Sequence, residues 1–250
     1  DYQYDYMPER SSMPIYGNVA TYISDGKKIT SIPVYFLKSM SEPMIQLMAR
    51  GDKFRVNREK YKNEFNFYGS QKEKFTEQAI PFMTEFGLFN FKLLLDTLGL
   101  QYDALGDYSI NINPQKKFKT QPSDSLFKPM MHRSDNFFAE QTLLMASNEQ
   151  LGYMSDKDII DTLLKTALKD IPQKPRWVDG SGLSRYNLFT PMDFVYLLSK
   201  MKNEFNWERI KNILPTGGEG TLTNYFKTDA GFIFAKTGTL SNNCALSGYL

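Results

Sequence analysis

Two sequence patterns divide this chain, and their order constrains the fold more than any single motif does. Short runs rich in β-branched and aromatic residues fill the first third, at residues 19–23, 29–36, 54–56, 64–68 and 75–80. The Asp25-Gly26 pair between the first two runs predicts a hairpin turn. Aromatic and polar residues alternate from Tyr2 to Tyr6, which is typical of a further strand. The first third is therefore predicted to be mostly sheet.

Apolar residues at helical spacing take over later in the chain. A helix over residues 83–98, stopped by Gly99, is expected to pack on the sheet, and residues 102–120 read as a solvated connection. We expect a domain boundary near 115–121, which separates residues 1–120 from 121–250. Three later helices are predicted, one of them over 156–169. Their inward-facing residues are expected to be Phe137, Phe138, Gln141, Leu144 and Met145; Ile159, Leu163, Leu164 and Leu168; and Phe194, Leu197, Leu198 and Met201.

Helix-start signals are clear at three places. Ser123 can cap the first of these helices, Ser155 with Asp158 imitates a capping box, and Thr190-Pro191 is a cap and first-turn pair.

Composition excludes several classes of function. The net charge is only +2, from 30 basic and 28 acidic residues, which is not the strongly basic charge that polyanion binding requires. Nucleic acid is therefore not an expected partner. No run of 18 apolar residues predicts a membrane span. The lone Cys244 and the lone His132 exclude a structural zinc cluster, and we expect neither a metal nor a cofactor. A Ser-His-Asp hydrolase would have to use His132, which we interpret as a helix-surface imidazole.

The segment Lys236-Thr237-Gly238-Thr239 lies between two apolar runs, 231–234 and 245–250, that predict a strand hairpin. The lysine would supply positive potential, a threonine hydroxyl can hold a carboxylate, and a glycine lets a substrate backbone lie against the strand. The same Lys-Thr-Gly triplet accompanies S-x-x-K and S-D-N in penicillin-binding proteins and class A β-lactamases.

A second unusual segment is the loop 178–187, with the sequence VDGSGLSRYN. Two glycines around a serine predict a tight loop that can hold Ser184 and Asn187 outward between helices. Alternatively, the loop could simply cap helices without touching a substrate.

Together these motifs resemble the D-alanyl-D-alanine carboxypeptidase/endopeptidase family of low-molecular-mass class C penicillin-binding proteins, serine peptidase family S13. The resemblance is carried by residues 179–187, 214–215, 220–222, 236–240 and 246–249, and by the upstream run 128–140. It covers most of residues 121–250 strongly and residues 1–120 loosely. It implies an α+β fold, in which helices flank an antiparallel sheet in a penicillin-binding, β-lactamase-like transpeptidase domain, with a β-rich inserted region over 1–120 and the C-terminal part of the transpeptidase domain over 121–250.

The resemblance also implies a mechanism and a set of roles. An S-x-x-K serine would attack a D-Ala-D-Ala carbonyl and form an acyl-enzyme. Ser184 would relay protons as the second-motif serine, and Asn187 or the adjacent Tyr186 would face the substrate amide. Lys236 would supply the potential. Thr237 and Thr239 would line the substrate carboxylate and carbonyl, with the Thr239 N–H as an oxyanion donor. Gly238 would also be substrate-binding, since it lets the substrate backbone lie against the strand. The family's second motif is S-x-N, whereas Asn187 lies three positions after Ser184.

The nucleophile is the main departure from the family. Three S-x-x-K matches begin at Ser24, Ser125 and Ser199, and none has the expected setting. The sequence 134–136, Ser-Asp-Asn, spells the β-lactamase motif, but on one helix its serine would lie roughly 13 Å along the axis from Ser125. We interpret both Ser125 and Ser134 as structural. In the family that the chain resembles, the nucleophile precedes the inserted region, so the resemblance implies a fragment whose nucleophile lies upstream of Asp1. The chain also starts without Met, which suggests a processed or excised piece.

The leading hypothesis is thus an extracytoplasmic or periplasmic enzyme that acts on peptidoglycan stem peptides and binds β-lactams. A non-catalytic module of the same fold that binds cell-wall peptides is the rival hypothesis. A class A β-lactamase is a third, which the motif spacing disfavours.

Overall fold

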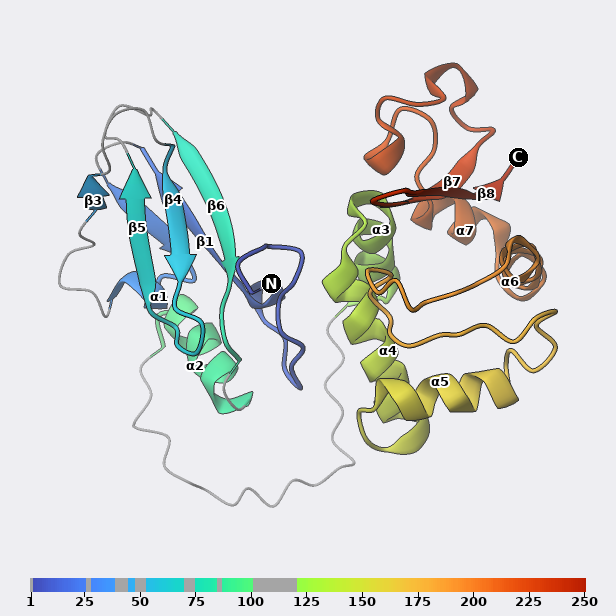
Figure 1. Cartoon of the computed structure of the whole chain (residues 1–250), viewed down its shortest axis with the longest axis horizontal. Coiled ribbons are helices and arrows are strands. Elements are labelled where there is room, and N and C mark those ends of the chain that lie inside the picture. The colour runs from blue at the N-terminus through green and yellow to red at the C-terminus, as the bar shows by residue number, and fades with distance from the viewer. Residues whose placement is uncertain are drawn as a thin grey trace. The chain divides into compact units, whose positions relative to one another are not determined.

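The computed structural model describes residues 2–25, 28–38, 45–47, 53–69, 75–84, 87–100 and 121–250. The chain forms two compact units, Asp1–Lys116 and Lys117–Leu250. In Figure 1 the first unit carries the strands drawn in blue and cyan, and the second carries most of the helices. No described helix is both long enough and apolar enough to cross a bilayer. The interpretation of the units as an insert and part of a transpeptidase domain stays a prediction.

Two three-stranded sheets build the first unit. One has the order β2-β1-β6 and is antiparallel; the other has the order β3-β5-β4, in which β3 runs parallel to β5. Gln78 links the sheets, because its side chain accepts a hydrogen bond from the Val56 N–H and donates one to the Val56 carbonyl. The bounds are η1 Tyr16–Asn18, β1 Val19–Ser24, β2 Ile29–Ile32, α1 Tyr35–Lys38, β3 Ile45–Leu47, β4 Arg55–Arg58, β5 Phe65–Gly69, β6 Thr76–Pro81 and α2 Gly87–Thr97.

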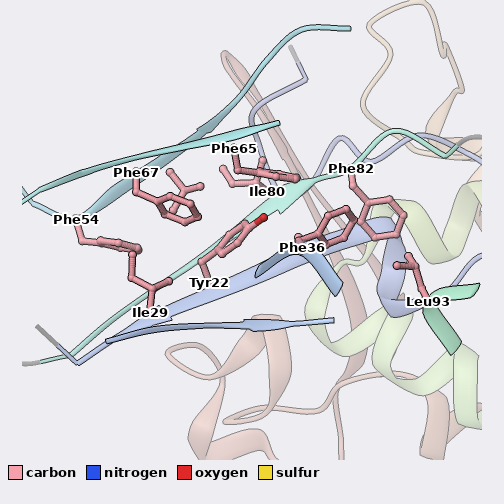
Figure 2. Close-up of a cluster of buried hydrophobic side chains, with 11 residues drawn as sticks. Tyr22, Ile29, Phe36, Phe54, Phe65, Phe67, Ile80, Phe82 and Leu93 are labelled. Carbon is pink, nitrogen blue, oxygen red and sulfur yellow. The ribbon is translucent and has the colours of Figure 1, made fainter. Parts of the chain in front are cut away.

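An aromatic core fills this unit. Alternating residues of β1, β4 and β5 are buried, as the period of a strand requires. Figure 2 shows Tyr22, Phe65 and Phe67 converging in this core, and the Tyr22 ring lies 5.1 Å from each of the two phenylalanine rings. Burial raises the pKa of the Tyr22 hydroxyl far above its ordinary value.

The second unit begins with helices and ends with a hairpin. Its elements are α3 Asp124–Arg133, α4 Asn136–Leu151, α5 Asp156–Lys165, α6 Pro191–Glu204, α7 Trp207–Ile213, η2 Gly220–Leu222, η3 Lys227–Asp229, β7 Phe234–Leu240 and β8 Asn243–Tyr249. The buried side chains Leu143, Ile159 and Ile160 join α4 to α5. Arg209 of α7 donates to both carboxylate oxygens of Asp124 and so ties α7 to the start of α3.

Several local predictions are wrong, each for a local reason. Residues 2–6 form turns, in which the Tyr4 and Tyr6 rings stack, instead of a strand. The second strand stops at Ile32, because Pro33 follows and cannot donate to the sheet. The helix predicted over 156–169 ends at Lys165, and β7 starts at Phe234 instead of residue 231.

The predicted helix faces are partly correct. Phe137, Gln141 and Leu144 are buried in α4, but Met145 is 55% exposed and Phe194 of α6 is 40% exposed. The caps of α5 and α6 are confirmed, because Ser155 accepts from the Asp158 N–H and Thr190 forms a full capping box with Asp193. Ser123 precedes α3 without capping it through its side chain. The turn residue Gly26 lies outside the described residues.

Candidate active site

Lys236 lies on β7, the strand that the Lys-Thr-Gly motif predicts. Its neighbour Ala235 points into the protein, and Lys236 itself is partly buried. The ammonium Nζ donates a hydrogen bond of 2.8 Å to Ser134 Oγ and another to the Thr237 carbonyl. Burial lowers the pKa of Lys236 below its ordinary value. The strand thus presents a partly desolvated lysine directly to a serine hydroxyl.

Ser134 occupies the junction between α3 and α4. It is the C-cap of α3 and adopts a left-handed conformation, with φ 56° and ψ 48°. A non-glycine residue in this region is uncommon and is often found at functional sites. Asp135 then caps α4, because its carboxylate accepts from the Phe138 N–H at 3.0 Å. The chain therefore turns sharply at Ser134 and holds its hydroxyl at the end of two fixed helices.

A cleft of about 470 Å³ surrounds the Lys236–Ser134 pair. One wall comes from the end of α3 and the first turn of α4, including Asn136, and another from residues 181–183. The strand residues 236–240 and the β8 residues 243–245, with the exposed Cys244, complete the lining. Thr237, Gly238 and Thr239 all lie here, together with Lys236 as the motif predicts.

The outer edge of β7 is available to a ligand. β8 pairs with one edge of β7 from Phe234 to Leu240, and the described residues place no strand against Lys236–Leu240 on the other edge. A methyl group added at Gly238 would meet only the Ala245 side chain, at 3.8 Å. The fold therefore does not itself require a glycine at this position, which leaves the space above Gly238 open.

Ser184 and Asn187 do not line this cleft. They line a neighbouring one of about 660 Å³ between the loop 178–187, α6 and β8. The Asn187 amide is used within its own loop: it accepts from the Val178 N–H and donates to Asp179. Ser184 Oγ accepts from the Tyr186 N–H. The loop contributes Ser181, Gly182 and Leu183 to the Lys236 cleft instead.

Asp179 organises the loop 178–187. One carboxylate oxygen accepts from the Ser181 N–H, the Ser181 hydroxyl and the Asn187 amide, at 2.9–3.1 Å. Glu140 of α4 accepts from the same Ser181 N–H at 3.0 Å and anchors the loop to the helix that begins after Ser134. In this structure the Ser184 hydroxyl contacts its own loop, and its implied role as a proton relay stays a prediction.

Sequence reasoning passed over Ser134 and Asn136 as cleft residues. The argument against Ser134 assumed one continuous helix from Ser125, whereas α3 ends before Ser134 and a new helix starts at Asn136. The capping pattern of Asp135 ahead of Phe138 was the signal that could have revealed the break. Within the described part of the chain, no cluster of acidic, histidine and cysteine side chains could hold a metal ion.

The family model for the D-Ala-D-Ala carboxypeptidase 3 (S13) family matches residues 112–250, more than half of the chain. The chain belongs to this family. The match contains every residue that lines the Lys236 cleft. The family assignment therefore agrees with the resemblance drawn from the motifs.

Individual relatives of the S13 family extend the comparison. A D-alanyl-D-alanine carboxypeptidase of Actinomadura sp. (strain R39) is 42% identical over 80 residues, which cover 29% of this chain and 15% of that protein. Two crystal structures of penicillin binding protein 4 (dacB) from Haemophilus influenzae share the fold, one of them in complex with a β-lactam. The complex has a TM-score of 0.61 at 19% identity over 97% of this chain, and the other structure 0.63 at 18% over 98%.

These solved structures establish the α+β penicillin-binding fold that the resemblance implies. The chain spans about three fifths of the length of each, with coverages of 61% and 59%. The S13 chain thus carries a large part of that fold.

Proposed function

We propose that this chain carries the lysine side of the active site of a serine D-Ala-D-Ala carboxypeptidase or endopeptidase that acts on peptidoglycan stem peptides. The main support is the 2.8 Å hydrogen bond from Lys236 to Ser134, which lies beside an open strand edge. A strand with a free edge can bind an extended peptide by main-chain hydrogen bonds. The adjacent threonines, Thr237 and Thr239, offer hydroxyl and N–H donors for a terminal carboxylate and a developing oxyanion.

In the proposed reaction, a nucleophilic serine attacks the carbonyl of the penultimate D-Ala. An ester forms to the serine, the peptide bond to the last D-Ala breaks, and the released amine takes the proton that the serine lost. Ser134 is suited to relay that proton, because its hydroxyl both contacts Lys236 and opens to the cleft. This assigns to Ser134 the role that the family resemblance implied for Ser184. Water, or an acceptor amine, then releases the acyl group.

The nucleophile is proposed to come from a part of the gene product outside this chain. Among the described residues, no serine that begins an S-x-x-K match lines the cleft. Ser24 is buried in β1 of the first unit, and Ser125 and Ser199 are exposed on α3 and α6. This absence also favours the second candidate, a module that binds cell-wall peptides without chemistry. An extracytoplasmic location follows from the proposed substrate.

Labelling with a fluorescent penicillin tests the proposal. The complete product of the gene that encodes this chain, and the 250-residue chain itself, are incubated with the reagent and weighed as intact proteins. We expect a covalent adduct on the complete product and none on the isolated chain. Both Ser134→Ala and Lys236→Ala should slow labelling by roughly 10²- to 10³-fold, the typical effect of losing one such donor.

Ser184→Ala is the matched control, because Ser184 lies outside the cleft. Slow labelling of this variant with normal labelling of Ser134→Ala would return the proton relay to Ser184. A complete product that gains no adduct, but whose amide resonances along β7 shift with a D-Ala-D-Ala peptide, would favour the binding module. If the complete product gains no adduct and also binds no D-Ala-D-Ala peptide, both functions are excluded.

A further inference from the structure

Residues 214–216 lie between the two elements that carry the Ser134–Lys236 pair. On one side they are fixed to the start of β7: the Pro215 carbonyl accepts from the Ala235 N–H at 3.0 Å, and Thr216 bridges to Phe234. Ala235 immediately precedes Lys236. Any shift of this segment therefore moves the strand at the lysine.

His132 holds the other side of the same segment. Its imidazole hydrogen-bonds to the backbone of Leu214, and its buried Nε2 has no hydrogen-bond partner. Nδ1 is consequently the atom that donates to the Leu214 carbonyl. His132 lies two residues before Ser134, in the last turn of α3. The path from the serine to the lysine is thus short: His132 to Leu214, then Pro215 to Ala235.

A close backbone approach reinforces this contact. Gly220, which starts η2, has φ +49°, and a Cβ there would lie 2.8 Å from the His132 carbonyl oxygen and 3.0 Å from its Cα. The end of α3 therefore packs directly on η2, whose Leu222 is fully buried. This packing fixes the backbone of His132 at the end of α3.

The surroundings of His132 keep its ring neutral. Burial is the largest cause and lowers the pKa of His132, and the charge of Lys128, one helical turn earlier, lowers it further. Glu219 and the Leu214 carbonyl raise it by less, so the pKa lies below the ordinary value for histidine. A neutral ring with the proton on Nδ1 matches the single donor that the geometry requires.

We propose that His132 is a positioning residue, which sets the hydrogen-bond distance between Ser134 and Lys236 by donating from Nδ1 to the Leu214 carbonyl. Only the expected effect of His132 on catalysis rests on the proposed function. The geometric part stands on this chain alone.

NMR can test the position of the imidazole proton, because His132 is the only histidine of the chain. Long-range ¹H–¹⁵N spectra of the untagged chain show one imidazole, whose nitrogen shifts report the tautomer directly. We expect a neutral ring with the proton on Nδ1 from about pH 7 upward, since the ordinary midpoint near 6.5 is lowered. A proton on Nε2, or a rapidly averaged ring, would overturn the proposal.

Two substitutions separate the hydrogen bond from the packing. His132→Asn places an amide N–H where Nδ1 was, whereas His132→Phe fills the space without a donor. Crystal structures should retain the Ser134–Lys236 hydrogen bond in the asparagine variant and lose it in the phenylalanine variant. The same distance in both variants would refute positioning by the imidazole, and this result needs no enzyme activity.

Penicillin labelling of the complete gene product then tests the functional part. His132→Phe should label at least tenfold more slowly, because displacements near 1 Å can cost up to about 10²-fold. His132→Asn should recover most of the labelling rate. Each variant is measured at a temperature equally far below its own unfolding midpoint. If the unsubstituted protein labels and both variants match it, positioning is wrong. If the unsubstituted protein does not label, the proposed function fails, and the crystal structures still decide the geometry.

Discussion

A methyl group would meet very different surroundings at Gly238 and Gly248, two glycines of the same hairpin. At Gly238 it would touch only Ala245, at an ordinary contact distance of 3.8 Å. At Gly248 it would lie 2.2 Å from the Phe234 carbonyl oxygen and 2.5 Å from the Ala235 backbone. One glycine is therefore dispensable to the fold and the other is not.

We expect Gly238→Ala to change the free energy of unfolding by no more than about 0.5 kcal/mol, as is usual for surface substitutions. It should nevertheless label with penicillin at least about tenfold more slowly, because the new methyl group displaces a ligand from the strand edge. Gly248→Ala should lose about 1–3 kcal/mol of stability by overpacking. Urea unfolding and labelling rates measure the two effects, and normal labelling of Gly238→Ala would argue against ligand binding along β7.

Lys236 carries a stability cost whose pH dependence can be predicted. Its folded pKa lies below the unfolded value, so burial of the charged form destabilises the protein at neutral pH. The cost disappears as the pH rises past the unfolded pKa near 10.4. Lys236→Met should therefore raise the unfolding midpoint at pH 7, with a gain that shrinks toward pH 10–11. A gain that is constant with pH in thermal scans would exclude burial of the charge as its cause.

Ser134 shows where residue patterns stop being informative. Its contact with Lys236 spans 102 residues of sequence, and no local rule brings the two together. The lysine side of the cleft was predictable, because Lys236, Thr237 and Gly238 act through a single strand. The serine side depends on how two helices join and where their junction packs, which is decided by tertiary contacts.

At the scale of elements, local capping chemistry predicted α6 well and the loop 178–187 poorly. Thr190 and Asp193 satisfy each other within four residues, so the start of α6 can be deduced from its own sequence. The loop instead depends on which donors reach Asp179, including the side chain of Asn187. Its composition predicts a tight turn but not which hydroxyls are used internally.

Asp179→Ala tests the loop as a unit. Three donors would lose their shared acceptor, and we expect the free energy of unfolding to fall by about 1–3 kcal/mol. Hydrogen exchange should accelerate across residues 178–187 while α6 stays protected. Labelling should slow, because residues 181–183 form one wall of the cleft. Asp179→Asn, which keeps one acceptor oxygen, is the matched control, and equal exchange in both variants would contradict the role of the carboxylate.

At the scale of the whole molecule, the described residues that line the Lys236 cleft belong to the second unit. The first unit has its own aromatic core. We therefore expect a complete gene product without residues 1–116 to keep penicillin labelling within a small factor. Circular dichroism verifies folding, and loss of labelling from a folded deletion variant would assign the first unit a direct part in the site.

The unpaired edge of β7 in the described structure also has a consequence for behaviour in solution. Exposed main-chain donors and acceptors on a strand pair with any other extended chain, including a second copy of the same strand. The isolated 250-residue chain should therefore self-associate as its concentration rises. A ligand that occupies the strand should dissolve these assemblies, so light scattering with and without a D-Ala-D-Ala peptide would report occupancy of the cleft as a change in colloidal stability.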